Sequence, residues 1–427
     1  MSMNHYAVPD IPGIKVEETA WLKEKIAKLL DLNSYKFPGA QPISFGKAQM
    51  DEINNEDYYV AEKSDGIRCL ALLTRNQEKK PEIYLFDRKS NFFLVNKMYF
   101  PLPQDPSFHK VHDNTIIDGE LVLDKEDDGS TQLKFLLFDC LMVQGRSLIS
   151  RDLIKRLGYL KVEVLGPYNR MLQKYPHFKK KYPFITEFKE QQPTYKLDAV
   201  FEQVIPNLRH GNDGLIFTSV KSPYLLGTSN KIIKWKPANE NSVDFKVQLT
   251  FVPSTTIPGA IDPTKKPTID LLAWERDDEY SKFTQLGITD EEWFDTFGKN
   301  PRHFNGRIIE CNYDIELQQK YGLVSPWRFM RFRDDKPHAN HITTIRNVII
   351  SIDDGVTKEE LVDNIDNIRN QWNLRDEIQK ENERREKERR EKERREIGRR
   401  ENERNENYSE ENHRVENQRK RKQDHIE

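Results

Sequence analysis

A lysine with unusual neighbours stands near the start of the chain. The run Glu62-Lys63-Ser64-Asp65-Gly66-Ile67-Arg68 combines a primary amine, acids, a glycine and a guanidinium. A lysine amine attacks an electrophile only when it is neutral, and desolvation or nearby cations lower its pKa toward that state. Taken alone, a lysine and an acid beside a turn are more often solvated than catalytic. With these neighbours, Lys63 is nevertheless a candidate nucleophile, and Asp65 is a candidate to orient its amine.

The apolar runs on either side predict how this lysine is positioned. Residues 58–61 and 67–73 read as two β-strands, and Asp65-Gly66 reads as the tight turn that joins them in a hairpin. Residues 37–45 contain two prolines and a glycine, which predict an extended segment leading toward the hairpin.

Two acids follow on a further predicted strand. In residues 115–123 the two-residue period places Asp118 and Glu120 on the same face. Residues 135–141 are apolar enough for a central strand, and Phe138 lies among them. By residue type alone, Glu120 is more often an exposed strand acid and Phe138 a core residue.

A second acid-glycine pair, Asp213-Gly214, precedes another apolar run. In residues 231–237 the strand period places Lys234 and Lys236 on one face, away from the apolar residues. Two ammonium groups on one strand face repel each other unless an anion lies between them. A phosphate is the natural candidate, and surface solvation is the alternative.

Composition excludes several classes of protein. The 427 residues carry a formal charge of −2, so any basic site depends on placement and not on an excess of cations. The three cysteines lie singly in apolar runs without the spacing of a metal site, which predicts reduced core residues. No apolar run approaches the roughly 18 residues of a membrane span, and the first residues lack a secretory signal. We expect an intracellular protein without a membrane partner.

The pattern divides the chain into four parts. Residues 1–240 hold the lysine, acid and lysine-pair motifs. Residues 241–340 contain short strand-like runs at 243–252, 269–274, 307–313 and 327–332, typical of a small antiparallel barrel of OB type. This part includes Asp244 and ends in a cationic cluster. Residues 341–376 include a capping box, Thr357 with Glu360, before a helix expected to pack back on the core. Residues 377–427 form a charged low-complexity tail, either a solvated single helix or disordered. Its basic run 419–422 fits a nuclear-import signal and solvated surface charge equally well.

The motifs together carry a resemblance to a known family. In order along the chain they are Lys63-x-Asp65-Gly66, Asp118-Gly119-Glu120, Asp213-Gly214-Leu215-Ile216, Lys234-x-Lys236 and Arg331-x-Arg333-x-Asp335-Lys336. They resemble the covalent nucleotidyltransferase superfamily, which joins mRNA guanylyltransferases and ATP-dependent polynucleotide ligases. Residues 37–42 and 327–336 resemble the capping enzymes more than the ligases. The resemblance implies an α+β fold, with a nucleotidyltransferase domain of antiparallel sheets and helices and a C-terminal OB-fold domain.

The resemblance also implies a reaction in two steps. GMP from GTP becomes attached to a lysine as pyrophosphate leaves, and then moves to the 5'-diphosphate end of nascent mRNA. Mg²⁺ or Mn²⁺ is the implied metal. Lys63 is carried over as the nucleophile, and the implied metal ligand is Asp213. The implied nucleotide-binding residues are Asp65, Arg68, Glu120, Phe138, Asp213, Lys234, Lys236, Asp244, Arg331, Arg333 and Lys336.

Individual roles follow from the same resemblance. Arg68 and Glu120 are expected at the ribose and Phe138 on the guanine ring. Lys234 and Lys236 are expected at the α-phosphate. Residues of the cationic cluster, Arg333 and Lys336, are expected to reach the β- and γ-phosphates when the OB domain closes.

Partners are implied in the same way. Only about sixty residues precede Lys63, too few for a triphosphatase domain. This favours the fungal-type arrangement, in which a separate RNA 5'-triphosphatase subunit acts beside the guanylyltransferase. The phosphorylated C-terminal tail of RNA polymerase II and the nascent RNA 5' end are further implied partners, and the nucleus is the implied location.

Two other functions remain open at this point. An ATP-dependent RNA or DNA ligase would share the lysine chemistry, and a catalytically silent RNA-binding scaffold would share only the fold. The intact set of lysines and acids argues against the scaffold.

Overall fold

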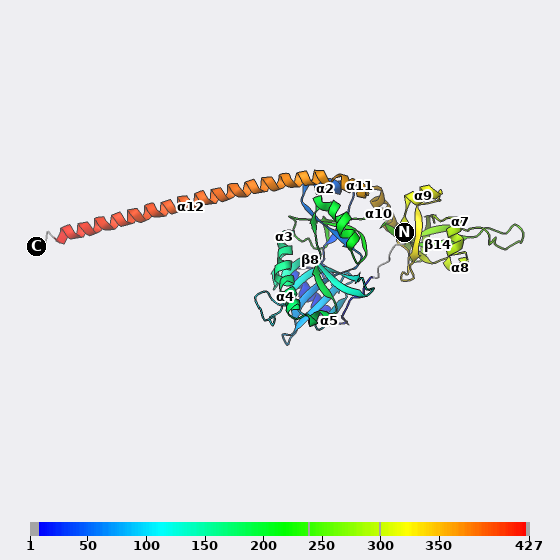
Figure 1. The fold of residues 1–427 in the computed structure, drawn as a ribbon, viewed down its shortest axis with the longest axis horizontal. Coiled ribbons are helices and arrows are strands. Elements are labelled where there is room, and N and C mark those ends of the chain that lie inside the picture. The colour runs from blue at the N-terminus through cyan, green and yellow to red at the C-terminus, as the bar shows by residue number, and fades with distance from the viewer. Residues whose placement is uncertain (1–7, 238–239, 299, 424–427) are drawn as a thin grey trace. The chain divides into compact units, whose positions relative to one another are not determined.

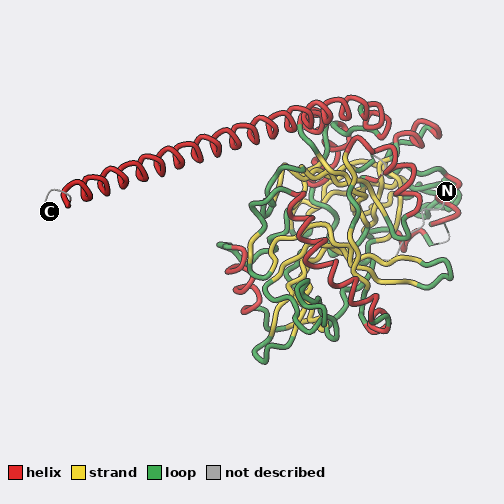
Figure 2. Tube along the Cα trace, turned by 60° about the vertical axis from the view of Figure 1, so that its left-hand side comes forward, coloured by secondary structure: helices red, strands yellow, loops and turns green. Residues whose placement is uncertain are grey.

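The computed structural model describes residues 8–237, 240–298 and 300–423. The backbone divides into two compact units, Met1–Ile368 and Arg369–Glu427. Strands dominate the first unit, with helices around them (Figure 2). No helix in the described part of the chain is long and apolar enough to cross a membrane.

The larger sheet of the first unit has the order β1-β6-β5-β4-β7-β8-β10, with β9 paired to β8. Its central pairs are antiparallel, and β10 joins β8 in parallel. Apolar residues of its strands fill the core between this sheet and helices α3 (Leu153–Tyr159) and α4 (Gly166–Lys174). The strands are β1 (Ile14–Val16), β4 (Ile67–Arg75), β5 (Pro81–Asp87), β6 (Phe92–Val95), β7 (Thr115–Lys125), β8 (Thr131–Val143), β9 (Arg146–Ser147) and β10 (Ile185–Phe188).

A second sheet has five strands in the order β11-β3-β12-β13-β2. Strand β3 carries Lys63 and pairs with β12, which pairs in turn with β13, the strand of Lys234. The sheet therefore brings together three motifs that are far apart in the sequence. The strands are β2 (Gln41–Ser44), β3 (Tyr58–Ser64), β11 (Gln192–Pro193), β12 (Asn212–Ser219) and β13 (Thr228–Trp235).

The hairpin expected around Asp65-Gly66 is wrong. Strands β3 and β4 follow each other at these residues but belong to different sheets and do not pair. The two-residue link instead carries the chain from one sheet to the other, and it passes so close to β7 that a Cβ on Gly66 would lie 2.3 Å from the carbonyl oxygen of Leu121. Gly66 is needed for this close approach and not for a tight hairpin turn.

Helices surround the two sheets and connect their strands. Helices α3, η1 and α4 follow one another, η1 contacts both of the others, and α3 and η1 contact β8. The three cysteines are buried and free, as expected from the sequence. The helical elements up to β12 are α1 (Ala20–Leu30), α2 (Lys47–Asn55), α3 (Leu153–Tyr159), η1 (Leu160–Leu165), α4 (Gly166–Lys174), α5 (His177–Lys181), η2 (Thr194–Lys196), α6 (Leu197–Ala199), η3 (Val200–Val204) and η4 (Ile205–Asn207).

A third sheet follows Pro237 and has five antiparallel strands in the order β16-β15-β14-β17-β18. It has its own apolar core, and the OB-type domain expected from the sequence is confirmed. Strand β16 lacks a continuous apolar run and was not among the expected strands. The elements are β14 (Ser242–Thr250), β15 (Thr268–Arg276), β16 (Glu279–Gln285), α7 (Asp290–Thr296), α8 (Pro301–Phe304), β17 (Ile308–Tyr313), α9 (Ile315–Tyr321) and β18 (Trp327–Phe332).

Three helices follow β18 in the described residues: α10 (Ile342–Asp353), α11 (Lys358–Asp363) and α12 (Ile365–Gln423). The capping box of Thr357 and Glu360 forms at the start of α11. Leu361, Ile365 and Ile368 are buried in one apolar cluster with residues of β3, β12 and β13. This segment is thereby anchored on the lysine-bearing sheet.

The second unit consists of the remainder of α12, a continuous helix in Figure 1. Its charged side chains pair at i,i+4 spacing, as in Arg385 with Glu381 and Arg390 with Glu386. Such pairs stabilise exposed helices. Of the two alternatives for the tail, the structure has the single helix, and the side chains of the basic run 419–422 lie outside its described residues.

Candidate active site

A cavity of about 330 Å³ lies between the lysine-bearing sheet and the larger sheet. Strands of both sheets contribute to its walls because β3 and β4 separate at Gly66. The predicted site residues that line it are Lys63, Arg68, Glu120, Phe138, Lys234 and Lys236.

The carboxylate of Asp213 forms ion pairs with two of the cavity lysines. Its Oδ1 lies 2.5 Å from Nζ of Lys63, and its Oδ2 lies 2.5 Å from Nζ of Lys236. Gly214 makes this placement possible, because it has a φ of +145° and a Cβ there would lie 2.0 Å from the carbonyl oxygen of Trp235. Burial raises the pKa of Asp213, but the two lysines outweigh burial and lower it overall. Asp213 is therefore a fixed anion beside the candidate nucleophile.

Lys234 faces the same cavity without a partner of its own. Its side chain makes no ion pair with any carboxylate in the described part of the chain. The alternating pattern is confirmed, since Ile233 and Trp235 are buried on the opposite face. Burial lowers the pKa of Lys234, and the charges of Lys236 and Lys63 lower it further. An anionic ligand would relieve this repulsion.

Arg68 forms one wall and is held rigidly. Its Nε and Nη2 donate to the two carboxylate oxygens of Asp118 at 3.0 and 2.6 Å, and Nη1 donates to the carbonyl oxygen of Ala40. Its guanidinium lies 5.3 Å from the centre of the Phe138 ring. Asp118 and Glu120 do share a face, as expected, but Asp118 orients Arg68 and only Glu120 faces the cavity.

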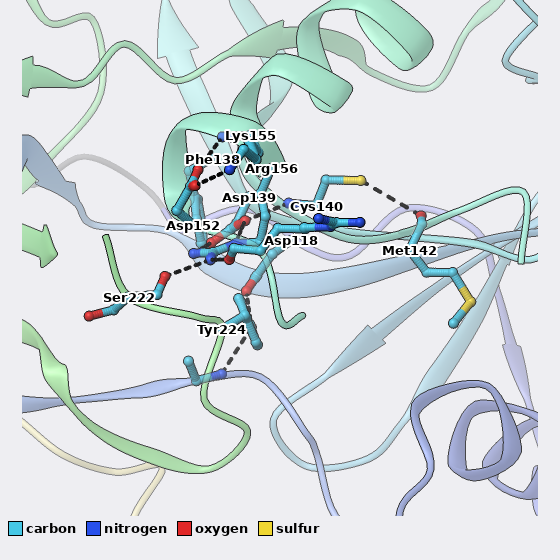
Figure 3. A network of polar contacts seen from close by, with 12 residues as sticks. Asp118, Phe138, Asp139, Cys140, Met142, Asp152, Lys155, Arg156, Ser222 and Tyr224 are labelled. Atoms are coloured by element: carbon cyan, nitrogen blue, oxygen red, sulfur yellow. Dashed lines mark hydrogen bonds and ion pairs between the residues drawn. The ribbon is translucent and has the colours of Figure 1, made fainter. Parts of the chain in front are cut away.

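Behind this wall lies a buried polar network, shown in Figure 3. The hydroxyl of Tyr224 donates to Asp118 and accepts from the backbone N–H of Ala40 at 2.9 Å. Asp139, on β8, accepts from Nε and Nη2 of Arg156 at 2.8 and 3.0 Å. All of these side chains are almost fully buried, so their pairing fixes β7, β8 and α3 relative to one another.

The cavity contains a second polar group, which the sequence analysis did not predict. Lys189 follows β10, is 6% exposed and donates to Oγ of Ser64 at 2.6 Å. Its Nζ also lies 3.2 Å from Glu62. Glu62 and Ser64 lie on the buried face of β3, and two polar residues at inward positions of a strand are the signal that could have found them. Lys189 stands alone in the sequence and has no such signal.

His210 lies outside the cavity and holds the carboxylate of Glu62 in place. Its Nδ1 lies 2.7 Å from Asp124, and its Nε2 lies 3.4 Å from Glu62. Burial lowers the pKa of His210, but the two carboxylates outweigh burial and raise it to about 9. His210 is therefore a buried cation at neutral pH.

Glu120 is the carboxylate that remains available in the cavity. It makes no hydrogen bond or ion pair with another side chain in the described ranges. Burial raises its pKa, and the charges of Lys189 and Lys63 oppose that rise. A ligand hydroxyl would supply the missing hydrogen-bond donor.

The remaining predicted residues lie elsewhere. Asp65 is exposed in the link between the sheets and does not line the cavity, so its expected nucleotide contact stays a prediction. Asp244, Arg331, Arg333 and Lys336 belong to the OB domain and do not line the cavity either. Arg333 instead contacts Asp244 at 2.9 Å, and Arg331 contacts Glu310 at 2.7 Å.

A metal ion would need ligands beyond the protein. No group of three or more His, Cys, Asp or Glu side chains suited to a metal occurs among residues 8–237, 240–298 and 300–423. Mg²⁺ in nucleotide sites usually takes one or two carboxylates together with substrate phosphates and water. Asp213 does not itself line the cavity, but it contacts Lys63 and Lys236, which do, and fits such a shared site.

The fold and the site define a nucleotidyltransferase: a lysine amine, flanked by a carboxylate and further cations, faces a cavity between two sheets of a two-domain enzyme. Two family models identify it further. The mRNA capping enzyme catalytic domain matches residues 6–238, and the mRNA capping enzyme C-terminal domain matches residues 240–362. The chain therefore belongs to the mRNA capping enzyme family, and the family expected from the sequence is confirmed.

Full-length relatives agree. The chain is 40% identical over 370 residues to the "mRNA-capping enzyme subunit alpha" of Schizosaccharomyces pombe, covering 85% of this chain and 88% of the relative. It is 34% identical over 427 residues to the Saccharomyces cerevisiae protein of the same name, covering 88% and 89%. A solved structure described as "mycobacterial DNA ligase D complexed with ATP and MES" is 14% identical, with a TM-score of 0.35 over 70% of this chain and 96% of that one. That likeness is too low to bear on the function.

Proposed function

We propose that this enzyme transfers GMP from GTP to the 5'-diphosphate end of nascent mRNA through a covalent Lys63–GMP intermediate. The observation that carries this proposal is the position of the Lys63 amine, 2.5 Å from Asp213 in a cavity that also contains Lys234 and Lys236. The family of the chain supports the same reaction.

In the first step, neutral Nζ of Lys63 attacks the α-phosphorus of GTP. A P–N bond forms as the bond to the β-phosphate oxygen breaks, and pyrophosphate leaves. Lys234 and Lys236 bind the α-phosphate oxygens, where negative charge is concentrated during the reaction. Asp213 is positioned to accept the proton that Lys63 must lose, because its carboxylate already contacts that amine.

In the second step, an oxygen of the terminal phosphate of the RNA attacks the same phosphorus. The P–N bond breaks, the amine of Lys63 takes up a proton, and the cap phosphate bridge forms. The contacts of Lys234 and Lys236 serve both steps because the α-phosphate takes part in both.

The position of Lys189 in the cavity favours guanine over adenine as the bound base. Guanine presents two acceptors, N7 and O6, where adenine presents N7 and an amino donor. The ammonium of Lys189 has only donors, so it can satisfy guanine O6 but repels the amino group of adenine. Phe138 offers a ring for stacking, and Glu120 offers a carboxylate for the ribose hydroxyls.

Mg²⁺ or Mn²⁺ would be held by Asp213 together with the phosphates of GTP. When bound, the ion neutralises charge on the leaving pyrophosphate. Arg333 and Lys336 of the OB domain are proposed to reach the β- and γ-phosphates when that domain closes over GTP. Asp244 and Arg331 would support them from the same sheet.

The name "subunit alpha" of the relatives supports a partner subunit. We propose that this partner is a separate RNA 5'-triphosphatase, which supplies diphosphate ends. The phosphorylated tail of RNA polymerase II and a nuclear location complete the proposal, since capping acts on nascent transcripts.

Labelling with radioactive nucleotide tests the reaction. The purified protein is incubated with α-labelled GTP or ATP and a divalent metal, and the products are separated on a denaturing gel. We expect label from GTP on the protein, and its transfer to diphosphate-ended RNA. Label from ATP alone would indicate a ligase-type enzyme, and no label from either nucleotide would indicate a silent scaffold.

A further inference from the structure

A second pocket, of about 390 Å³, opens beside the nucleotide cavity. It is lined by Lys36, Phe37, Gln41, Arg88, Lys89 and Ser90. Gln41 and Arg88 line both hollows, so the two are continuous at these side chains. Lys36 and Lys89 line the second pocket but not the nucleotide cavity, and we refer to the second pocket as the outer pocket.

The outer pocket is cationic and its cations are unpaired. The side chains of Lys36, Arg88 and Lys89 are exposed, and none of them forms an ion pair with a carboxylate among the described residues. The neighbouring Asp87 offsets one of these charges, but its carboxylate already accepts hydrogen bonds from the backbone N–H groups of Lys89 and Asn91. In a chain of net charge −2, this is a local excess of positive charge.

The pocket is also pre-formed. Arg88 and Lys89 occupy the turn between β5 and β6, which is closed by a hydrogen bond from Ser90 N–H to the carbonyl oxygen of Asp87 at 3.0 Å. On the other wall, the ring of Phe37 packs against Phe86 with centroids 5.1 Å apart. Two fixed walls therefore hold in place the backbone that carries these cations before a ligand arrives.

We propose that the outer pocket binds the 5' end of the acceptor RNA during the second step, with Arg88 at the terminal phosphates and Lys36 and Lys89 at the phosphodiesters that follow them. This inference rests on the proposed guanylyltransferase function and adds the acceptor site to it. In a displacement in line with Lys63, the entering RNA phosphate takes the place that the leaving pyrophosphate vacated, opposite the lysine amine.

The residues that line each hollow distinguish the site of GTP, the GMP donor, from the site of RNA, the GMP acceptor. Arg88, which lines both, is placed to meet the β-phosphate of either substrate. Lys36 and Lys89 do not line the nucleotide cavity, so they are placed to meet the part of a substrate that extends beyond it. RNA continues past its terminal phosphates with further phosphodiesters, whereas GTP ends at the γ-phosphate.

The test compares Lys36→Ala, Lys89→Ala and the double variant with Lys80→Ala. Lys80 is an exposed lysine beside the other end of β5, roughly 20 Å away along the strand, where it pairs with Glu78. Each protein is first labelled with GTP, and GMP transfer from the isolated adduct to diphosphate-ended RNA is then measured in single turnover at several RNA concentrations.

We expect the double variant to need at least about 10-fold more RNA for half-maximal transfer and to show a weaker dependence on salt. Its adduct formation from GTP should match wild type, which also shows that it is folded. Lys80→Ala should match wild type in both steps.

Two results would overturn the inference. Equal losses in adduct formation and transfer would assign the pocket to the phosphates of GTP, and unchanged RNA dependence in the double variant would show that the pocket binds neither. Binding of diphosphate-ended and hydroxyl-ended RNA to the unlabelled protein provides a readout that needs no adduct. If the double variant binds both RNAs more weakly than wild type and Lys80→Ala do, the proposal is supported even where guanylylation fails.

Discussion

The carboxylate of Asp213 lies 2.5 Å from the amine of Lys63, although 149 residues separate them in the sequence. This contact exists because β3 and β12 are neighbours in one sheet and Gly214 lets the chain bend at the start of β12. It gives the amine a fixed direction and a proton acceptor before substrate arrives. The charge of Asp213 also balances Lys236, so both lysines depend on one acid.

Replacement of Lys63 should abolish the GMP adduct. Lys63→Ala removes the nucleophile, and Lys63→Arg keeps a cation beside Asp213 but offers a guanidinium that stays protonated. We expect both variants to lose adduct formation by at least about 1,000-fold. The measurement is denaturing gel analysis after labelling with GTP, with circular dichroism as the folding control. Adduct formation by either variant would exclude Lys63 as the attachment site.

Replacement of Asp213 should separate a site acid from a surface acid. Asp213→Asn leaves Lys63 and Lys236 without their anion, so adduct formation should fall by at least about 100-fold. Asp65→Asn is the matched control, because Asp65 is two residues from Lys63 but exposed. Initial rates of adduct formation over a range of Mn²⁺ concentrations give the comparison. Equal losses of adduct formation in both variants would show that Asp65 contributes to the site as much as Asp213.

Much of this site was predictable because strand alternation is a local property. The two-residue period placed Lys234 and Lys236 on one face, and burial of Ile233 and Trp235 confirms it. Pairing between strands is not local. The Asp65-Gly66 signal indicated a hairpin, but the partners of β3 and β4 are set by sequence-distant strands, so the link joins two sheets.

The sequence pattern does not indicate site residues that belong to no motif. Lys189 and His210 belong to no repeat or motif, and their roles come from contacts with Glu62 across the fold. Strand β16 was missed for a different reason: it is polar along most of its length and is stabilised by pairing with β15.

The buried cation of His210 predicts how stability depends on pH. Its pKa is about 9 in the folded protein, above the 6.5 of an unperturbed histidine. A group whose pKa rises on folding contributes its full stabilisation below the unfolded value and loses it as the pH approaches the folded value. Stability should therefore fall between pH 6.5 and 9, by on the order of 3 kcal/mol.

Urea unfolding at intervals across this range measures that change. His210→Gln should flatten the dependence. His112→Gln is the matched control, since burial lowers the pKa of His112 to about 4 and it stays neutral throughout the range. A slope that persists unchanged in His210→Gln would assign the effect to another group.

Truncation should distinguish the anchored start of the last helix from its charged remainder. Ending the chain after Glu377 removes only tail residues, so folding and adduct formation should stay within about two-fold of wild type. Ending it after Asn364 also removes Ile365 and Ile368, which are buried against the lysine-bearing sheet. That second truncation should lower stability by about 3 kcal/mol or more. Thermal unfolding and adduct yield test both, and loss of adduct in a soluble Glu377 truncation would give the tail a role.

The last prediction separates the two chemical steps through the OB domain. Lys336 is exposed on that domain, and its proposed contacts are with phosphates that leave as pyrophosphate in the first step. Lys336→Ala should therefore slow adduct formation by at least about 10-fold yet change transfer from preformed adduct to RNA by less than about two-fold. Arg333→Ala is a weaker test, because Arg333 also holds the buried Asp244 and its loss would disturb the domain. Lys234→Ala is the contrasting variant and should impair both steps, since the α-phosphate takes part in both. Single-turnover rates for each step give the answer, and equal defects in Lys336→Ala would place that residue at the α-phosphate.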